Sequence, residues 1–287
     1  MEKVKLRYIA GIILVLKISI IAYLVYAFTH TNETLLKDGW EEEFMFFAIA
    51  GFIAQIIDGA LGMAYGVSST TILTSFGVPQ AIISASVHTA EVFTTGVSGL
   101  SHLYMKNIDK KLFIRLVITG VIGAVVGAVL LTNYIDGKVI KPYISSYLLL
   151  LGIWILIKSF RTAPQKLINF RYVPILGFIG ALCDAIGGGG WGPIVTSNLI
   201  DKGNSPKEII GTVNTAEFFV TFFCTGVFIF FVGVKAWLCV IGLIIGGVIA
   251  APIGAMIIKF IQPKTLLRMV GILIVVTSSY NLYKVFG

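Results

Sequence analysis

Charged residues are scarce in this sequence. Lysine, arginine, aspartate and glutamate make up 13% of its 287 residues, about half of the ~25% that is usual in soluble domains. Hydrophobic residues make up 57%, and the mean hydropathy is +0.93. This composition leaves almost no room for a soluble domain. It predicts an all-α protein whose helices cross the lipid bilayer several times.

Motifs of metal binding and soluble enzymes are also missing. The three cysteines, Cys183, Cys224 and Cys239, lie in apolar segments at spacings that fit no metal or redox motif. There is no P-loop, no His-Glu-x-x-His and no Gly-x-Ser-x-Gly. We therefore expect a protein that is not an enzyme and that has no cofactor and no resident metal.

The net charge of +8 does not indicate a nucleic-acid partner. Positively charged loops on the cytoplasmic side orient most inner-membrane proteins, and they account for such an excess. The expected surroundings of this chain are lipid, and no nucleic acid is expected among its partners.

A glycine-rich stretch interrupts the apolar run from Pro174 to Ile200. It extends from Asp184 to Pro193 and contains four consecutive glycines, 187–190. Four glycines and a proline cannot continue a helix cheaply. A carboxylate beside them is costly in a bilayer unless it has a partner or water. The broken helix and the acid together predict a functional site within the membrane.

The same pattern occurs earlier, between Asp58 and Gly66, and the two copies superpose without a gap. The matching pairs include Gly51-Phe52-Ile53 with Gly177-Phe178-Ile179, Asp58 with Asp184, and Thr89-Ala90-Glu91 with Thr215-Ala216-Glu217. This is an internal repeat. Paired hydrophobic segments interrupted by glycine in matching halves are typical of transporter binding sites.

The repeat divides the chain into four parts. Residues 1–43 hold an N-terminal transmembrane helix, in the apolar run Tyr8–Phe28, and an acidic loop; residues 44–160 form the first repeat. Residues 161–173 form a cytoplasmic link, and residues 174–287 form the second repeat. The N-terminal run is too long for a signal peptide, and no cleavage site follows it. Each repeat is expected to contain a hairpin of two short helices, such as Phe44–Ile57 and Val67–Phe76, and then three full helices.

Basic residues predict the orientation of these helices. They cluster after the third segment of the first repeat and in the link, at Lys106, Lys110, Lys111, Lys158, Arg161, Lys166 and Arg171. If both clusters are cytoplasmic, each hairpin returns to the side that it enters from, and the second repeat is inverted. The expected fold is an inverted-repeat helical bundle with two broken-helix hairpins and one extra N-terminal helix. It would lie in the inner (plasma) membrane, with the N-terminus cytoplasmic and the C-terminus outside, and a homo-oligomer is compatible with it. Three lysines depart from the rule: Lys138, Lys141 and Lys235.

The hairpins are expected to bind an anion between them. A half-helix that begins in mid-membrane directs unpaired N–H groups at the site, and glycines let these groups approach an oxyanion closely. Hydroxyl and amide groups add donors without adding charge. The candidate substrate-binding residues are Ser68, Ser69, Thr70, His88, Thr89, Gly188, Gly189, Gly190, Thr196, Asn214 and Thr215. A larger residue at Gly189 is expected to weaken binding before it weakens the fold.

Four acids near this site need a different explanation, because they repel an anion. Asp58 and Asp184 could cap the half-helices. Glu91 and Glu217 could tether the hairpins or carry protons, and Glu217 follows the more glycine-rich hairpin. His88 is expected to make packing or hydrogen-bonding contacts rather than bind metal, and Trp191 is expected to pack in the hairpin.

In these residues the chain resembles the TauE/SafE family of sulfite exporters, also called the 4-toluene sulfonate uptake permease family. The resemblance rests on the duplicated hairpin, the glycines at 187–190 and the twin Thr-Ala-Glu motifs, and it covers about residues 44–286. It implies secondary transport of sulfite, sulfonates or related sulfur oxyanions across a bacterial or archaeal inner membrane, without ATP. The first repeat departs from this pattern with Leu61-Gly62-Met63-Ala64, so the two halves need not bind symmetrically.

Two alternatives remain open at the level of sequence. One is a carrier of another small organic anion or of a divalent metal ion, for which the chain has hard ligands in Asp58, His88, Glu91, Asp184 and Glu217. The other is an intramembrane enzyme or accessory protein. The absence of a nucleophile–base pair and the duplication, which suits alternating access, both argue against it.

Overall fold

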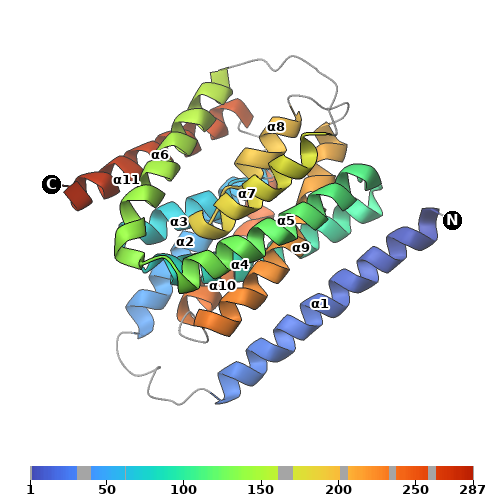
Figure 1. The fold of residues 1–287 in the computed structure, drawn as a ribbon, viewed down its shortest axis with the longest axis horizontal. Helices are drawn as coiled ribbons and strands as arrows, with labels where there is room; N and C mark the ends of the chain where they lie inside the picture. Colours follow the sequence, from blue (N-terminus) through green and yellow to red (C-terminus); the bar gives the residue numbers. More distant parts are fainter. Residues whose placement is uncertain are drawn as a thin grey trace.

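The computed structural model describes residues 2–30, 40–61, 63–160, 171–200, 206–232, 237–257 and 263–286. In these ranges every regular element is a helix (Figure 1). Gly62, residues 31–39 of the acidic loop, most of the link and Lys235 lie outside the described residues.

Helix α1 (Glu2–His30) precedes the two repeats. The first repeat contains α2 (Trp40–Leu61), α3 (Tyr65–Ser75), α4 (Gln80–Tyr104), α5 (Lys110–Asn133) and α6 (Gly137–Phe160). The second contains α7 (Val173–Gly187), one π-helical turn η2 (Gly192–Thr196), α8 (Ser197–Ile200), α9 (Pro206–Val232), α10 (Trp237–Ile257) and α11 (Pro263–Phe286). One expectation was wrong: α2 is not a short half-helix but has 22 residues, because the polar turn at Trp40 and the residues beyond Ile57 both continue it.

Four of the described helices are long and apolar enough to cross a membrane: Tyr8–Tyr26, Lys110–Asn133, Val139–Phe160 and Glu208–Val232. Helix α4 has 25 residues but is more polar, and it buries a face that includes His88, Thr89 and Glu91. A polar face within a long membrane helix is stable only when it faces the protein interior or a hydrated cavity. The protein is therefore an all-α, multi-pass membrane protein, as predicted.

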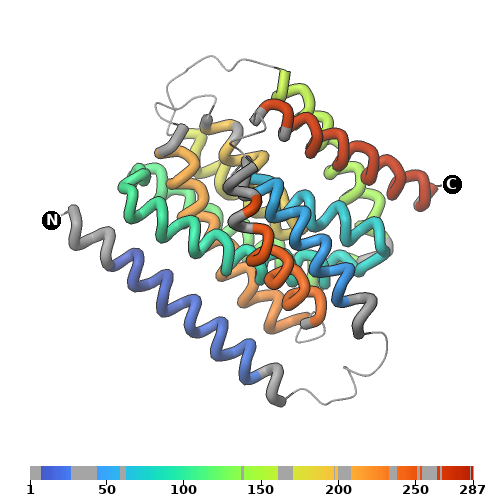
Figure 2. Tube along the Cα trace, turned by 180° about the vertical axis from the view of Figure 1, so that it is seen from behind, coloured from blue at the N-terminus to red at the C-terminus, as the bar shows by residue number. Residues whose placement is uncertain are grey.

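The main helix contacts join one repeat to the other. Helix α2 packs on α10, and its counterpart α7 packs on α5; α4 packs on α9, and α6 packs on α11 (Figures 1 and 2). Small residues allow these close crossings. A Cβ added at Gly246 would overlap the carbonyl oxygen of Ala48, and one at Gly123 would overlap that of Phe178. Helices of one repeat thus pack on helices of the other repeat, so the two repeats share one core. Helices at matching positions in the two repeats make matching contacts.

Helix α1 lies at the edge of the bundle, and its principal described contacts are with α4. Ile13 and Ile20 are buried against Val92, Leu103 and Phe218, while most of its other apolar side chains are exposed. The chain ends lie at opposite ends of the molecule in both views (Figures 1 and 2).

Candidate functional site

Both hairpins are interrupted at the positions predicted from the sequence. Between α2 and α3, Ala64 has a φ of 87°, in the left-handed region. After α7, Gly188 has a φ of 72° and ends the helix. Glycine adopts this conformation without strain, whereas alanine adopts it at a cost. The first break is therefore the more strained of the two.

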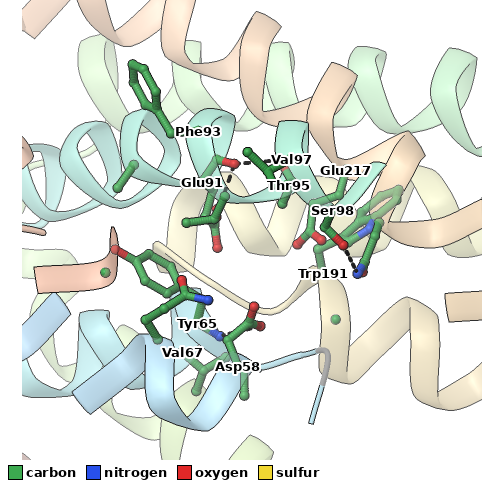
Figure 3. Close-up of a pocket in the computed structure, with 18 of the residues that line it drawn as sticks. Asp58, Tyr65, Val67, Glu91, Phe93, Thr95, Val97, Ser98, Trp191 and Glu217 are labelled. Atoms are coloured by element: carbon green, nitrogen blue, oxygen red, sulfur yellow. Dashed lines mark hydrogen bonds between the residues drawn. The ribbon is translucent and has the colours of Figure 1, made fainter. Parts of the chain in front are cut away.

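The two aspartates make equivalent contacts. Oδ1 of Asp58 accepts a hydrogen bond from the N–H of Tyr65 at 3.3 Å (Figure 3). Oδ1 of Asp184 accepts one from the N–H of Trp191 at 2.9 Å. Tyr65 begins α3, and Trp191 directly precedes η2. Each acid thus satisfies a backbone N–H at the start of its returning segment, which is the geometry of a helix cap.

Side chains of the first repeat satisfy the carbonyl groups at the end of α7. These hydrogen bonds run from Ser84 to Ala185 (2.5 Å), from Gln80 to Ile186 (3.1 Å), from Tyr147 to Gly189 (3.2 Å) and from Thr70 to Gly188. The last turn of a helix leaves its carbonyls without partners inside the helix. The break in the second repeat is therefore held in place by the first repeat.

His88 connects this network to a glutamate. Its Nδ1 lies 3.0 Å from Oε2 of Glu91, and its Nε2 lies 3.2 Å from the carbonyl oxygen of Asp184. Only a protonated Nε2 can donate to a carbonyl, so the contact with Glu91 contains a second proton, on the imidazole or on the carboxyl group. Both ring nitrogens are engaged, and the side chain is fully buried.

The two breaks touch through glycines. A Cβ added at Gly189 would lie 2.7 Å from the carbonyl oxygen of Gly66 and would overlap the backbone of Gly66 and Val67. A Cβ added at Gly66 would lie 2.8 Å from Cα of Gly189 and 2.8 Å from Oε1 of Glu91. Gly189 therefore packs backbone against backbone and does not face open space.

A cavity of about 670 Å³ lies beside this contact. Six of the predicted residues line it: Asp58, Glu91, Asp184, Gly190, Asn214 and Glu217. Figure 3 labels Asp58, Glu91 and Glu217 among them. The other predicted residues are buried without lining it: Ser68, Ser69, Thr70, His88, Thr89, Gly188, Gly189, Thr196 and Thr215. The hydroxyl groups of Ser68 and Thr196 have no hydrogen-bond partner among the described residues.

A sequence model of the family "Sulfite exporter TauE/SafE" matches residues 47–281. The chain belongs to this family. It is 44% identical over 249 residues, covering 82% of this chain and 81% of the relative, to "Probable membrane transporter protein YtnM" from Bacillus subtilis (strain 168). No solved structure matches the chain. The protein is thus a membrane transporter of the TauE/SafE type and not an enzyme, and α1 precedes the part that the family model covers.

The two glutamates of this TauE/SafE transporter differ in their surroundings. Glu91 pairs with His88, but the residue that corresponds to His88 in the second repeat is Asn214. The amide of Asn214 donates to Oγ of Ser98 at 3.1 Å and not to Glu217. No side-chain hydrogen-bond partner of Glu217 occurs among the described residues, and its carboxyl group lines the cavity.

The cavity is also lined by residues that reasoning from the sequence did not count among its site residues. Tyr65 and Trp191 occupy matching positions and anchor the two breaks by donating to the carbonyls of Leu243 and Val213, each at 3.4 Å. Trp191 is fully buried, as the packing role predicted, yet it also lines the cavity. The cavity is also lined by Gln55, Ser98 and Lys17. Their polar side chains within otherwise apolar helices could have identified them from the sequence.

Proposed function

We propose that this transporter is a secondary carrier of small sulfur-containing anions, such as sulfite, sulfonates or related oxyanions. The anion would bind in the cavity between the two broken hairpins and cross the inner membrane without ATP. The observation that carries this proposal is the cavity's position, because residues of both breaks, Gly66 and Gly190, line it. A site between two exchanged repeats is the arrangement that alternating access requires.

Neutral donors support an anion as the substrate. The N–H groups of Gly66 and Val67 lie in the first turn of α3, where N–H groups have no partner within the helix. Asn214 adds an amide to the cavity wall, and its contact with Ser98 uses one of its two N–H donors. These donors and the positive end of the α3 dipole favour an oxyanion without introducing a fixed charge.

The acids are compatible with an anion because most of them are already engaged. Asp58 and Asp184 accept backbone hydrogen bonds, and Glu91 is paired with His88. Only Glu217 has no such partner among the described residues, and we propose that it carries the proton whose transfer is coupled to transport of the anion. A protonated Glu217 would admit the anion, and loss of this proton would expel the anion by like-charge repulsion.

A divalent metal ion is the second candidate substrate, because ligand atoms of His88, Glu91 and Asp184 lie within 4.8 Å of one another. The hydrogen bonds of this cluster weigh against a metal. Both nitrogens of His88 and one oxygen of Asp184 are already bonded to protein groups, so a metal would have to break them. His88 also does not line the cavity.

Flux into proteoliposomes tests the proposal. Purified protein is reconstituted, a pH gradient is imposed, and uptake of labelled sulfite is measured with sulfonates, phosphate or Mn²⁺ as competitors. We expect accumulation that depends on the pH gradient and is inhibited by sulfonates. Uptake of Mn²⁺ without uptake of sulfite would contradict the proposal.

A further inference from the structure

Lys17 is a positive charge at the centre of a membrane helix. The apolar stretch of α1 extends over 19 residues, from Tyr8 to Tyr26, and Lys17 is its middle residue. At 1.5 Å per residue, the Cα of Lys17 lies about 13 Å from either end of this stretch. This is farther than a lysine side chain reaches, so Lys17 cannot place its charge at a membrane surface. An ionisable residue at this depth marks a functional site by default.

The side chain of Lys17 is directed at the transport bundle. Ile13 and Ile20, one turn before and one turn after it, are buried on the face of α1 that packs on α4. The stem of Lys17 lies along Gly96 of α4, where a Cβ would come within 2.8 Å of its Cδ. Gly96 thus provides the space through which the lysine passes.

The ammonium group ends at the cavity. Its Nζ donates to the carbonyl oxygen of Phe93 at 3.3 Å and lies 5.9 Å from the centre of the Phe93 ring. An ammonium has three donors, so two remain for a ligand. No carboxylate of the described residues lies within ion-pair distance of it; both recorded ion pairs involve His88.

Lys17 also differs in charge from the rest of the wall. It lines the cavity together with Thr94, Val97 and Ser98 (Figure 3 labels Val97 and Ser98), and it is the only lysine or arginine among the described lining residues. The other ionisable groups of the wall are four carboxyl groups, the phenol of Tyr65 and the imidazole of His102. A single charge in a low-dielectric cleft is felt strongly by a small ion of opposite sign.

We propose that Lys17 is the cation that binds the anion in the cavity, and that α1, which lies outside the part covered by the family model, thereby supplies a determinant of specificity. This inference rests on the proposed function. In it, α1 is a component of the binding site and not merely a membrane anchor.

Three variants of the full-length protein separate charge from packing. Lys17→Met removes the charge and keeps an apolar side chain, Lys17→Gln keeps a donor for Phe93 without a charge, and Lys17→Arg keeps the charge. Lys284→Met is the matched control. It also removes an ammonium near an aromatic ring, that of Tyr280 at 5.2 Å, but does so at an exposed position that does not line the cavity.

The measurement is the Kd for sulfite of each purified protein, by isothermal titration, together with its melting temperature. We expect the Kd to rise about 10- to 100-fold in Lys17→Met and Lys17→Gln, the range for a lost hydrogen bond to a charged group. Lys17→Arg and Lys284→Met should stay within about threefold of the parent. Lys17→Met and Lys17→Gln should melt no lower than the parent, because each removes a charge from the interior of the membrane. Lys17→Arg and Lys284→Met should melt close to the parent, because the first keeps the charge and the second changes an exposed side chain.

Two results would overturn the inference in distinguishable ways. If the parent binds sulfite and Lys17→Gln binds it equally well, the charge has no part in binding, and the proposed function stands without it. If the parent binds neither sulfite nor methanesulfonate, the proposed function fails and this inference fails with it.

Discussion

The contact between the two broken hairpins makes the sharpest prediction, at Gly189. In Gly189→Ala the new Cβ would lie 2.7 Å from the carbonyl oxygen of Gly66 and would overlap the backbone of Gly66 and Val67. These are backbone atoms, so no side-chain rotation can relieve the overlap. The half-helices of the two repeats would have to separate.

The cost follows from this geometry. Overpacking in a dense interior costs about 1–3 kcal/mol. The φ of Gly189 is 159°, a conformation that L residues rarely adopt, so alanine adds backbone strain of about 1 kcal/mol or more and brings no gain in entropy. We expect a total loss of about 2–4 kcal/mol, which corresponds to about 4–16 °C in melting temperature for a chain of this size. Sulfite binding should fall in parallel, because Gly66 lines the cavity.

The assay is thermal unfolding of detergent-solubilised protein at one fixed heating rate, followed by sulfite titration. Gly226→Ala in α9 is the control, because a Cβ there has no atom within 4 Å; it should leave stability unchanged or raise it slightly. The packing argument is refuted if Gly189→Ala has the same melting temperature as Gly226→Ala but no longer binds sulfite. Gly189 would then face the ligand, as the sequence suggested.

Three further predictions concern the acids and the orientation. Glu217→Gln should still bind and exchange sulfite but lose accumulation driven by a pH gradient, whereas the exposed Glu208→Gln should accumulate it normally; driven flux in Glu217→Gln equal to that of the parent would end the proton-coupling assignment. Asp184→Ala should lower the free energy of unfolding by about 1–3 kcal/mol, measured by thermal melting, because a cap and a buried contact are both lost. Reporter fusions at Gly287 and within 161–171 should report opposite sides of the membrane, and the same side for both would rule out the inverted orientation.

The sequence was sufficient to find the main elements of this fold, because each left a local signal. The apolar runs gave the helices, and the glycines beside Asp58 and Asp184 gave both breaks. Duplication implied matching roles, and the two aspartates do make matching contacts. Only the length of α2 was predicted wrongly, since its first turn is polar and no apolar pattern marks where the helix begins.

The site was predicted less well, because it depends on contacts between distant parts of the chain. Thr70 was predicted to bind a ligand because it is polar, but its hydroxyl group donates to a backbone carbonyl of the other repeat. His88 was a candidate ligand-binding residue too, and it makes the hydrogen bonds that were also expected of it. The glycine at 189 suggested a space in which an anion could approach the backbone, but in the structure Gly189 contacts the backbone of Gly66 and Val67. Lys17 was hidden within an apolar run, and only the packing of α1 on α4 shows where its charge lies.

The most direct test of the central claim, that the anion binds between the broken hairpins, is a crystal structure of the full-length protein with selenite. Selenite has the shape and charge of sulfite, and selenium is located by anomalous scattering. The account predicts one anomalous peak in the cavity, between the first turn of α3 and Asn214. It would be contradicted by a peak elsewhere, or by an empty cavity in a protein that transports selenite under the same conditions.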